Sequence, residues 1–218
     1  MELKALFILS FLVVAQCKLL TLSCEDIRVF VDGHNNRRIL VANGEVPGQP
    51  AASEMKMMVW DEELASKAAK WVSKNRNIHN PDRTIPSERF TTGENLYSYF
   101  TTNLKHDLGL DTAIQAWFDE HVNFTFGPLQ TSDFDDSKNY EIGHYTQMVW
   151  SDSTYLGCAV SQNIKNGWNK FYVACNYGPG GNYLFEKPYK VTGGPSGELL
   201  CSVKECSHRY GKKCRSYT

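Results

Sequence analysis

The residues of this sequence that could carry chemistry are six histidines and seven cysteines, and their spacing excludes two common kinds of hydrolase site. There is no HExxH motif, in which two histidines hold a catalytic zinc ion. There is also no GxSxG motif, and Ser196 lies in Gly-Pro-Ser-Gly, without the strand-to-helix turn that exposes a nucleophilic serine. Isolated histidines are more often structural residues than ligands.

The stretch from Gly143 to Asn182 combines one imidazole with the clearest strand patterns. It opens with GHYTQMVW, which presents His144 close to a tryptophan. Cys158–Val160 and Phe171–Cys175 are rich in residues that favour strands. The run Asn176–Asn182 holds three glycines and a proline, so it is expected to end the second strand.

The cysteines indicate a disulfide-bonded protein from an oxidising compartment. Cys158 and Cys175 fall on adjacent antiparallel strands, within reach of a disulfide that would close a loop of about 17 residues and contribute about 3 kcal/mol. Four further cysteines allow three pairings, and one of the last three must reach Cys24 unless a thiol stays free. These last three are Cys201, Cys206 and Cys214. Their spacing lacks the CxxC pairs of zinc ribbons.

The first 17 residues are predicted to be a secretory signal peptide. Met1–Lys4 supplies a positive charge, and Ala5–Ala15 is an almost unbroken apolar run of about 11 residues. A membrane-spanning helix needs about 20 apolar residues, and no later stretch approaches that length. Ala15-Gln16-Cys17 fits a cleavage site, so the mature chain is expected to begin near Lys18 and to be secreted and extracellular.

Helices are expected on both sides of a small antiparallel sheet, which gives a three-layer α/β/α sandwich stapled by disulfides. Ser23 and Asp26 form a capping-box pattern, and the helix that they open ends at Asn43. Asp61 is a predicted N-cap of the second helix, and Asp111 starts another. The chain divides into a domain of residues 18–192 and a cysteine-containing tail of residues 193–218.

Four blocks in the same order resemble the CAP superfamily, which comprises cysteine-rich secretory, antigen 5 and pathogenesis-related proteins. GHYTQMVW and YVACNYGPGGN resemble its two signatures, and HNNRR (His34–Arg38) and GENL (Gly93–Leu96) agree with it. The resemblance spans roughly Asp26–Tyr189 and implies the same sandwich fold. The segment Pro47–Ala65 is most similar to arthropod venom allergen 5-like members. Most members carry a disulfide near Asn75 that is missing here, so the long loop 77–92 is expected to be less tightly held.

The resemblance implies a central cleft in which His79, Glu94, Glu120 and His144 converge. Two imidazoles beside carboxylates suit Zn²⁺, bound weakly by His79 and His144 with water in the other positions. Alternatively, a carboxylate could orient an imidazole that acts as a general base. A third interpretation is structural, with His–Glu hydrogen bonds that hold the long loops against the sheet.

Three functions follow as expectations. The first is a secreted effector without catalysis or a required cofactor, such as a venom or salivary component that binds a receptor or channel of a host or prey. The relatives that act on channels carry a larger cysteine-rich module, which weakens a channel target. The second is a secreted protease or other hydrolase, for which Ser151 and Ser153 are the serines nearest to His144. The third is a sterol or lipid carrier, with a groove lined by Tyr97, Tyr99 and Phe100.

Charge and modification signals add two expectations. The net charge of −1 gives no general case for nucleic-acid binding. Cys201–Thr218 holds five basic residues and one acid, so it carries about +4 and the rest of the chain about −5. This tail is either a solvated terminus or a segment attracted to an anionic surface, such as sulfated glycan or anionic lipid. Asn123-Phe124-Thr125 is the one N-glycosylation sequon.

Overall fold

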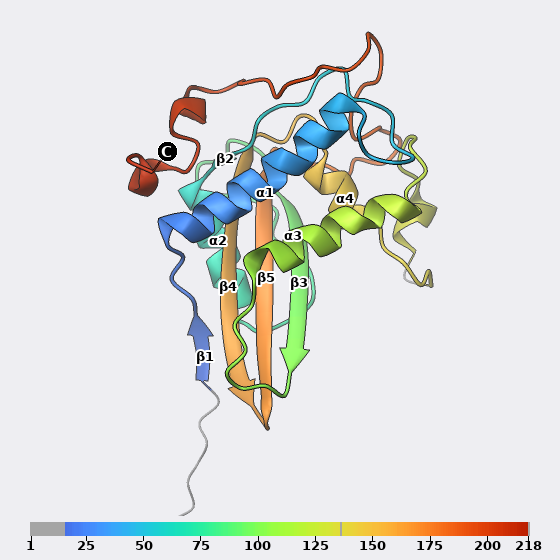
Figure 1. Cartoon of the computed structure of the whole chain (residues 1–218). Coiled ribbons are helices and arrows are strands. Elements are labelled where there is room, and N and C mark those ends of the chain that lie inside the picture. The colour runs from blue at the N-terminus through green and yellow to red at the C-terminus, as the bar shows by residue number, and fades with distance from the viewer. Residues whose placement is uncertain (1–15, 136, 218) are drawn as a thin grey trace, which may run out of the picture.

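The computed structural model describes residues 16–135 and 137–217 (Figure 1). The predicted signal peptide lies almost wholly outside this part of the chain and stays a prediction. Its last two residues begin strand β1 (Gln16–Leu19), which pairs antiparallel with β4. Cleavage after Cys17 would therefore leave Lys18 and Leu19 as the whole of this edge strand.

The helices and strands form the three layers expected from the sequence, with α1 and α3 on one face of the sheet and α2 on the other (Figure 1). The other strands are β2 (Val59–Trp60), β3 (Gly93–Thr101), β4 (Tyr155–Lys165) and β5 (Trp168–Gly178). The α-helices are α1 (Cys24–Asn43), α2 (Glu62–Val72), α3 (Leu110–Asp119) and α4 (Gly143–Met148). Short 3₁₀ helices are η1 (Glu120–Asn123), η2 (Thr131–Phe134), η3 (Lys204–His208) and η4 (Lys212–Cys214).

The sheet has the strand order β1-β4-β5-β3, and β2 joins β4 as a short parallel neighbour. Cys158 lies directly opposite Cys175 in the antiparallel register of β4 and β5, and a disulfide joins them. The β5 strand ends at Gly178, inside the glycine-rich run that was expected to end it. Because side chains alternate along a strand, the two faces of the sheet build two separate apolar clusters.

The larger cluster lies between the sheet and α1, and it includes Leu156 and Val160 of β4. The smaller one joins Ala159 to Ala68 and Val72 of α2. A Cβ at Gly157 would stand 2.1 Å from the backbone nitrogen of Ala65, so only glycine lets α2 approach β4 this closely.

The starts of the first two helices follow the cap signals in the sequence. The hydroxyl of Ser23 accepts a hydrogen bond from the Asp26 N–H, and the Asp26 carboxylate accepts one from the Ser23 N–H, so the predicted capping box is confirmed. Asp61 Oδ1 accepts from the N–H groups of Glu63 and Leu64 at 3.0 and 2.9 Å.

Asp61→Ala is expected to lower the free energy of unfolding by about 1 kcal/mol, because two N–H groups at the start of α2 lose their side-chain acceptor. The ion pair of Asp61 with Arg89 adds little, since Arg89 is partly exposed. Urea denaturation measures the change. Glu198→Ala, which removes an exposed acid outside the helices and strands, serves as the control and should leave the midpoint unchanged.

The HNNRR block ties α1 to the rest of the molecule. Burial lowers the pKa of His34 to about 3, and the neutral ring donates from Nδ1 to Phe30 O and accepts at Nε2 from the Tyr177 hydroxyl. Asn35 exchanges two hydrogen bonds with the backbone of Met58. The fully buried guanidinium of Arg38 donates to five backbone carbonyls, those of Lys56, Met148, Trp150, Ser151 and Ser153.

The C-terminal tail docks beside β2 and the start of α1. The Trp60 N–H donates to Arg209 O at 2.7 Å, and Leu200 exchanges backbone hydrogen bonds with the segment before β2. Of the pairings that the sequence left open, the structure has Cys24–Cys214 and Cys201–Cys206. The first of these disulfides fixes the tail to α1. Among the described residues, no helix is both long and apolar enough to cross a membrane.

Candidate metal-binding cleft

The four residues implied by the family resemblance line one cavity of about 980 Å³. His79 comes from the loop after α2, Glu94 from β3, Glu120 from η1 and His144 from α4. The rings of His79 and His144 have centroids 6.5 Å apart. Four segments that are distant in the sequence therefore bring two imidazoles and two carboxylates together.

The first imidazole is held by a buried carboxylate. His79 Nδ1 lies 2.9 Å from Glu94 Oε1, which also accepts from the Asn80 N–H at 2.8 Å. The Glu94 side chain is fully buried, whereas the His79 side chain is 52% exposed. Glu94 Oε2 has no hydrogen-bond partner among the described residues. The carboxylate thus fixes one nitrogen of a ring whose other edge faces outward.

The second imidazole is held by a carboxylate that also caps a helix. Ile142, the N-cap of α4, has no side chain that can accept a hydrogen bond. Glu120 Oε2 accepts instead from the N–H groups of His144 and Tyr145, at 2.9 and 3.0 Å. Its other oxygen lies 2.5 Å from His144 Nδ1. Glu120 therefore sets both the start of α4 and the orientation of the imidazole.

Glu141 is a further member of the cleft, which the sequence analysis missed. Its Oε2 lies 3.1 Å from His144 Nδ1, and its side chain is 73% exposed. Ligand atoms of Glu120, Glu141 and His144 all lie within 4.8 Å of one another, so these three residues could hold a metal ion. The Glu-x-x-His spacing is the signal that could have pointed to Glu141.

The carboxylates determine the charge of His144. Burial alone would lower its pKa, but hydrogen bonds and charge interactions with Glu120 and Glu141 outweigh burial and raise the pKa to about 9. The hydrogen bond to His144 in turn lowers the pKa of Glu141. His144 is therefore an imidazolium at neutral pH, and a metal ion that binds it must displace a proton.

The donor set fits a borderline ion such as Zn²⁺ in two ways. The Nδ1 atoms of His79 and His144 face carboxylates, which leaves both Nε2 atoms as donors and gives each ligand a carboxylate that orients it. These two nitrogens would supply two ligands for Zn²⁺ and would leave its other positions to water. The second donor set is Glu120, Glu141 and His144 Nδ1. The two sets share His144 but use different nitrogens.

The hydroxyl groups considered for hydrolysis do not reach this cleft. Ser153 is fully buried, donates from Oγ to Pro179 O at 2.7 Å and accepts from Gln147 Nε2. Neither Ser151 nor Ser153 is among the described residues that line the cavity.

The three rings considered for a sterol groove do not line one surface. Tyr97 lines the cleft. Tyr99 packs against His106, with centroids 5.0 Å apart, while Phe100 contacts Tyr172 on the opposite face of the sheet. The alternation of β3 places Tyr97 and Tyr99 on one face of the sheet and Phe100 on the other, so the three rings cannot form one groove.

The sequon lies next to the cleft. Asn123 is exposed at the end of η1, three residues after Glu120. Glycosylation of Asn123 stays a prediction, and a glycan there would stand beside the cavity.

Comparisons with known proteins agree with these observations. Residues 31–177 match the family model described as "CAP: Cysteine-rich secretory protein family". Venom allergen 5 of Rhynchium brunneum is 38% identical over 172 residues, which cover 77% of this chain and 73% of the relative. Venom allergen 5 of Vespa magnifica is 36% identical over 162 residues, which cover 72% of this chain and 68% of the relative.

Solved structures show the same fold. The crystal structure of NaASP2 with Zn²⁺ superimposes with a TM-score of 0.64 at 30% identity and covers 80% of this chain and 90% of that one. Na-ASP-1 gives a TM-score of 0.63 at 31% identity and covers 86% of this chain and 48% of that one. With its signature blocks, its disulfide-bonded sandwich and its His–Glu cleft, the chain belongs to the CAP family of cysteine-rich secretory proteins.

Proposed function

We propose that this protein is a secreted effector without enzymatic activity, a venom or salivary component that binds a protein of a host or prey. We also propose that its cleft binds a divalent metal ion weakly. The relatives named Venom allergen 5 support the first part, because they match most of the chain. The three disulfides fit an extracellular protein. The similar crystal structure of NaASP2 with Zn²⁺ supports the second part.

An exposed apolar rim beside the cleft is the observation that carries target binding. The rim consists of five residues that are at least 40% exposed, namely Phe134, Tyr140, Tyr183, Leu184 and Phe185. The first three of them also line the cavity. Exposed apolar residues grouped beside a cavity are typical of protein interaction sites.

Phe185 is the most exposed member of the rim, at 71%. Its backbone has φ = +67°, a conformation that is strained for a residue with a large side chain. A hydrogen bond from its N–H to Leu129 O, 2.8 Å long, helps to hold it there. A strained backbone that keeps a phenyl ring in water is expected where the ring serves a contact.

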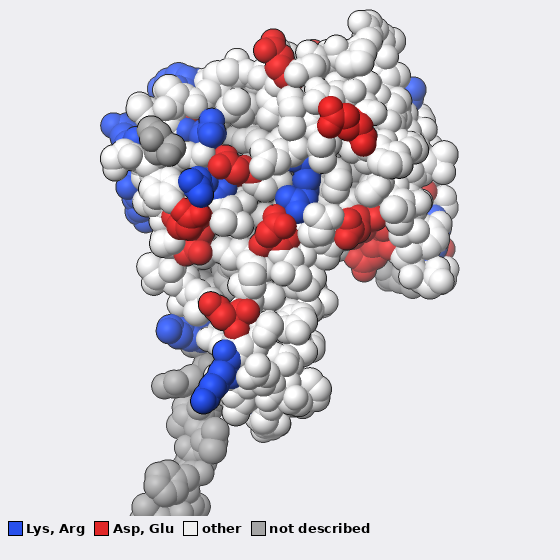
Figure 2. Space-filling view, in the orientation of Figure 1, with Lys and Arg blue, Asp and Glu red and all other residues white. Residues whose placement is uncertain are grey.

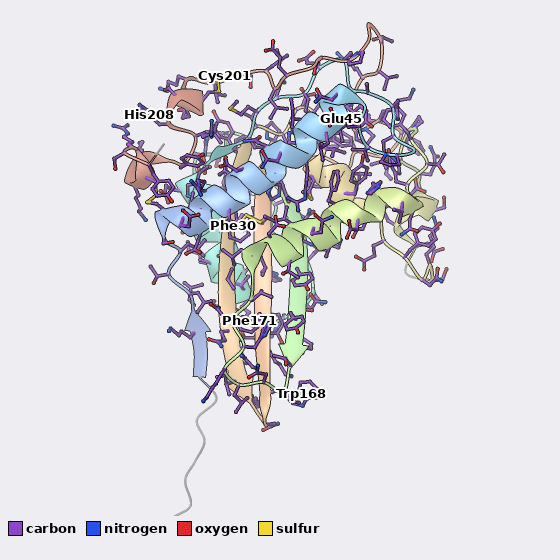
Figure 3. The ribbon with its side chains drawn as sticks, viewed as in Figure 1. Phe30, Glu45, Trp168, Phe171, Cys201 and His208 are labelled. Carbon is purple, nitrogen blue, oxygen red and sulfur yellow. A yellow bond between two sulfur atoms is a disulfide. The ribbon has the colours of Figure 1, made fainter. Side chains whose placement is uncertain are left out.

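Phe185→Ser together with Tyr183→Ser is expected to weaken binding to target-bearing cells at least about tenfold, because two aromatic anchors leave the interface. The measurement is saturable binding of the labelled protein to a panel of vertebrate and arthropod cells. Trp168→Ser is the matched control, since Trp168 is 44% exposed at the tip of the β4–β5 hairpin (Figure 3) and does not line the cavity beside the rim. Equal binding by the rim variant and the parent would contradict the proposal.

Turnover distinguishes this proposal from the alternative of a secreted hydrolase. A protease and esterase substrate panel, with and without Zn²⁺, should show no difference between the parent and a folded His79→Ala/His144→Ala variant. The protonated state of His144 supports this expectation, because an imidazolium cannot accept a proton from water or a hydroxyl. Activity in the parent that is lost in the variant would establish an enzyme. The sterol or lipid carrier is kept as a second alternative, to be tested by titration with a fluorescent sterol.

The tail could add attraction to anionic surfaces, but the body neutralises part of its charge. Arg209 lies 3.4 Å from Asp32, and Lys213 lies 3.7 Å from Glu62. Figure 2 shows Lys and Arg side chains interspersed with Asp and Glu over this end of the molecule. Attraction to an anionic surface therefore depends on the remaining basic residues of the tail.

A further inference from the structure

The end of the sheet where β4 turns into β5 carries exposed apolar side chains. The turn consists of Asn166 and Gly167, whose φ angles of +53° and +76° suit a two-residue hairpin. Figure 1 shows the strands extending past the helices at this end. Residues 100–105 and 163–170 are here called the sheet tip. Its apolar members, each at least 38% exposed, are Phe100, Leu104, Ile164 and Trp168.

Two aromatic rings of the sheet tip lie on the face of the sheet that α2 covers. Phe100 pairs with Lys170 between β3 and β5, so Trp168, two residues away, is its diagonal neighbour on the same face. The Phe100 ring contacts Tyr172, with centroids 5.7 Å apart, and Tyr172 packs against α2. Phe100 and Trp168 are both 44% exposed, so two aromatic side chains face water beyond the end of α2.

The aliphatic residues of the sheet tip come from its other face and from the loop beside it. Ile164 pairs with Asn169 between β4 and β5. Asn169 is buried, and its Nδ2 donates to Asn103 O and His106 O at 3.3 and 3.1 Å. These bonds hold the loop that contains Leu104 against the end of β5. Apolar groups therefore lie on both sides of the same end of the molecule.

The sheet tip is positively charged. The sequence holds no Asp or Glu in residues 95–106 or 153–185, so the tip itself contains no acid, and Asp107 is the first acid that follows it. With three lysines, the tip carries about +3 in a protein whose net charge is −1. Within the described residues, no carboxylate lies within ion-pair distance of Lys105, Lys165 or Lys170.

We infer that the sheet tip docks on a lipid bilayer that contains anionic lipid. In the docked state, Trp168 and Phe100 would enter the interfacial region, where aromatic side chains are favoured. The three lysines would lie at the level of the lipid phosphates, and each would strengthen binding about fivefold.

The combination of cations and apolar side chains selects a bilayer over other partners. A soluble polyanion would contact the lysines but would leave the four apolar side chains in water. A folded protein would need a groove that matches a convex end with apolar groups on both sides, whereas a fluid interface adapts to it. None of the tip residues lines the cleft or belongs to the apolar rim, so the inference does not rest on the proposed target.

The test is sedimentation of the full-length mature protein, with its disulfides intact, together with sucrose-loaded vesicles. Salt at about 0.1 M screens attraction beyond about 10 Å. Vesicles of phosphatidylcholine with about 30% phosphatidylserine should bind the protein at least about tenfold more strongly than phosphatidylcholine alone. Lys105→Gln/Lys165→Gln should weaken binding at least about tenfold, because two cations leave the docking surface.

The control removes the same charge from the tail, which lies at the opposite end of the molecule from Trp168 (Figure 3). Lys204→Gln/Lys212→Gln, at two exposed positions of the tail, should change binding less than about threefold.

Tryptophan fluorescence reports insertion directly. The protein has five tryptophans, and all except Trp168 are at most 6% exposed. Phosphatidylcholine brominated on its acyl chains, mixed with phosphatidylserine, should quench part of the fluorescence of the parent. Trp168→Phe should still bind and show no quenching. Trp168→Ser should weaken binding about tenfold, because it removes the largest exposed apolar side chain of the tip.

Three results would overturn the inference. The first is bound parent protein without quenching, which would show that the lysines attract any polyanion. The second is unchanged affinity in Lys105→Gln/Lys165→Gln, whose exposed positions do not endanger folding. The third is an equal loss in the tip and tail lysine variants, which would assign the attraction to the charge of the whole protein.

The sheet tip and the apolar rim can be tested separately. Anionic lipid lies mainly in the cytoplasmic leaflet of cells, so intact cells present little of it. Trp168→Ser should therefore bind intact cells as the parent does and lose binding to the vesicles, whereas Tyr183→Ser/Phe185→Ser should show the reverse. A secreted protein would meet anionic lipid on cells that have lost this asymmetry.

Discussion

Replacing Arg38 by methionine is expected to lower the free energy of unfolding by about 3–5 kcal/mol. The guanidinium is fully buried and donates to five backbone carbonyls in the segment before β2 and in the segment from the end of α4 to the start of β4. Methionine keeps most of the side-chain volume but donates nothing, so these carbonyls lose a donor in a place that water does not reach. Urea denaturation at pH 7 measures the loss.

Arg28→Met is the matched control. Arg28 lies on the same helix, but its side chain is 41% exposed, and its partners are Glu25 one turn away and the ring of Tyr217. Its loss should change the free energy of unfolding by less than about 0.5 kcal/mol. Similar midpoints for the Arg38 and Arg28 variants would show that the five carbonyls find other donors, and the proposed role of Arg38 would be wrong.

Local signals in the sequence were sufficient for the parts of the fold that depend on neighbouring residues. The capping box at Ser23 depends on two residues three positions apart, and the end of β5 depends on a run of glycines. The three-layer arrangement followed from the order of helices and strands. By contrast, four of the five carbonyl partners of Arg38 and the choice of Cys214 for Cys24 depend on chain segments more than a hundred residues apart. No local pattern encodes such contacts.

The residues of the candidate site, too, could be predicted only in part. The resemblance supplied His79, Glu94, Glu120 and His144, which the structure brings into one cavity. It did not supply Glu141, because the contact of this residue with His144 depends on how the chain enters α4. The docking of the tail was not visible at all, since the hydrogen bond from the Trp60 N–H to Arg209 O joins residues far apart in the sequence.

The loop 77–92 shows how polar contacts can take the place of a missing disulfide. Lys67 of α2 donates from Nζ to the carbonyls of Asp82 and Thr84, at 2.6 and 2.8 Å. Glu63 accepts from both the N–H and the hydroxyl of Ser87. Two side chains on one face of α2 thus hold a loop that the family pattern would hold with a disulfide. These hydrogen bonds join residues too far apart to be predicted from the sequence, and a looser hold on this loop than in relatives with the disulfide stays a prediction.

His144 is expected to titrate near pH 9, and Glu120→Gln should lower its pKa by more than one unit. In the parent, the two carboxylates outweigh the effect of burial, which by itself lowers the pKa. The variant keeps only Glu141, whose side chain is 73% exposed and therefore better screened by water. A glutamine at position 120 still accepts from the N–H groups of His144 and Tyr145, so α4 should keep its start. Titration of the imidazole signals by NMR gives both pKa values.

The same interaction makes stability depend on pH in a defined direction. Because the pKa of His144 is raised from 6.5 to about 9 on folding, its stabilising effect is fully present below pH 6.5 and is lost as pH rises through about 9. The loss amounts to about 3 kcal/mol when 1.36 kcal/mol is counted for each pH unit. Glu120→Gln should remove most of this slope, and Glu198→Gln, at an exposed acid outside the cleft, should keep it. Equal slopes in the parent and in Glu120→Gln would show that Glu120 does not hold His144 in its charged form, and the role assigned to Glu120 would be wrong.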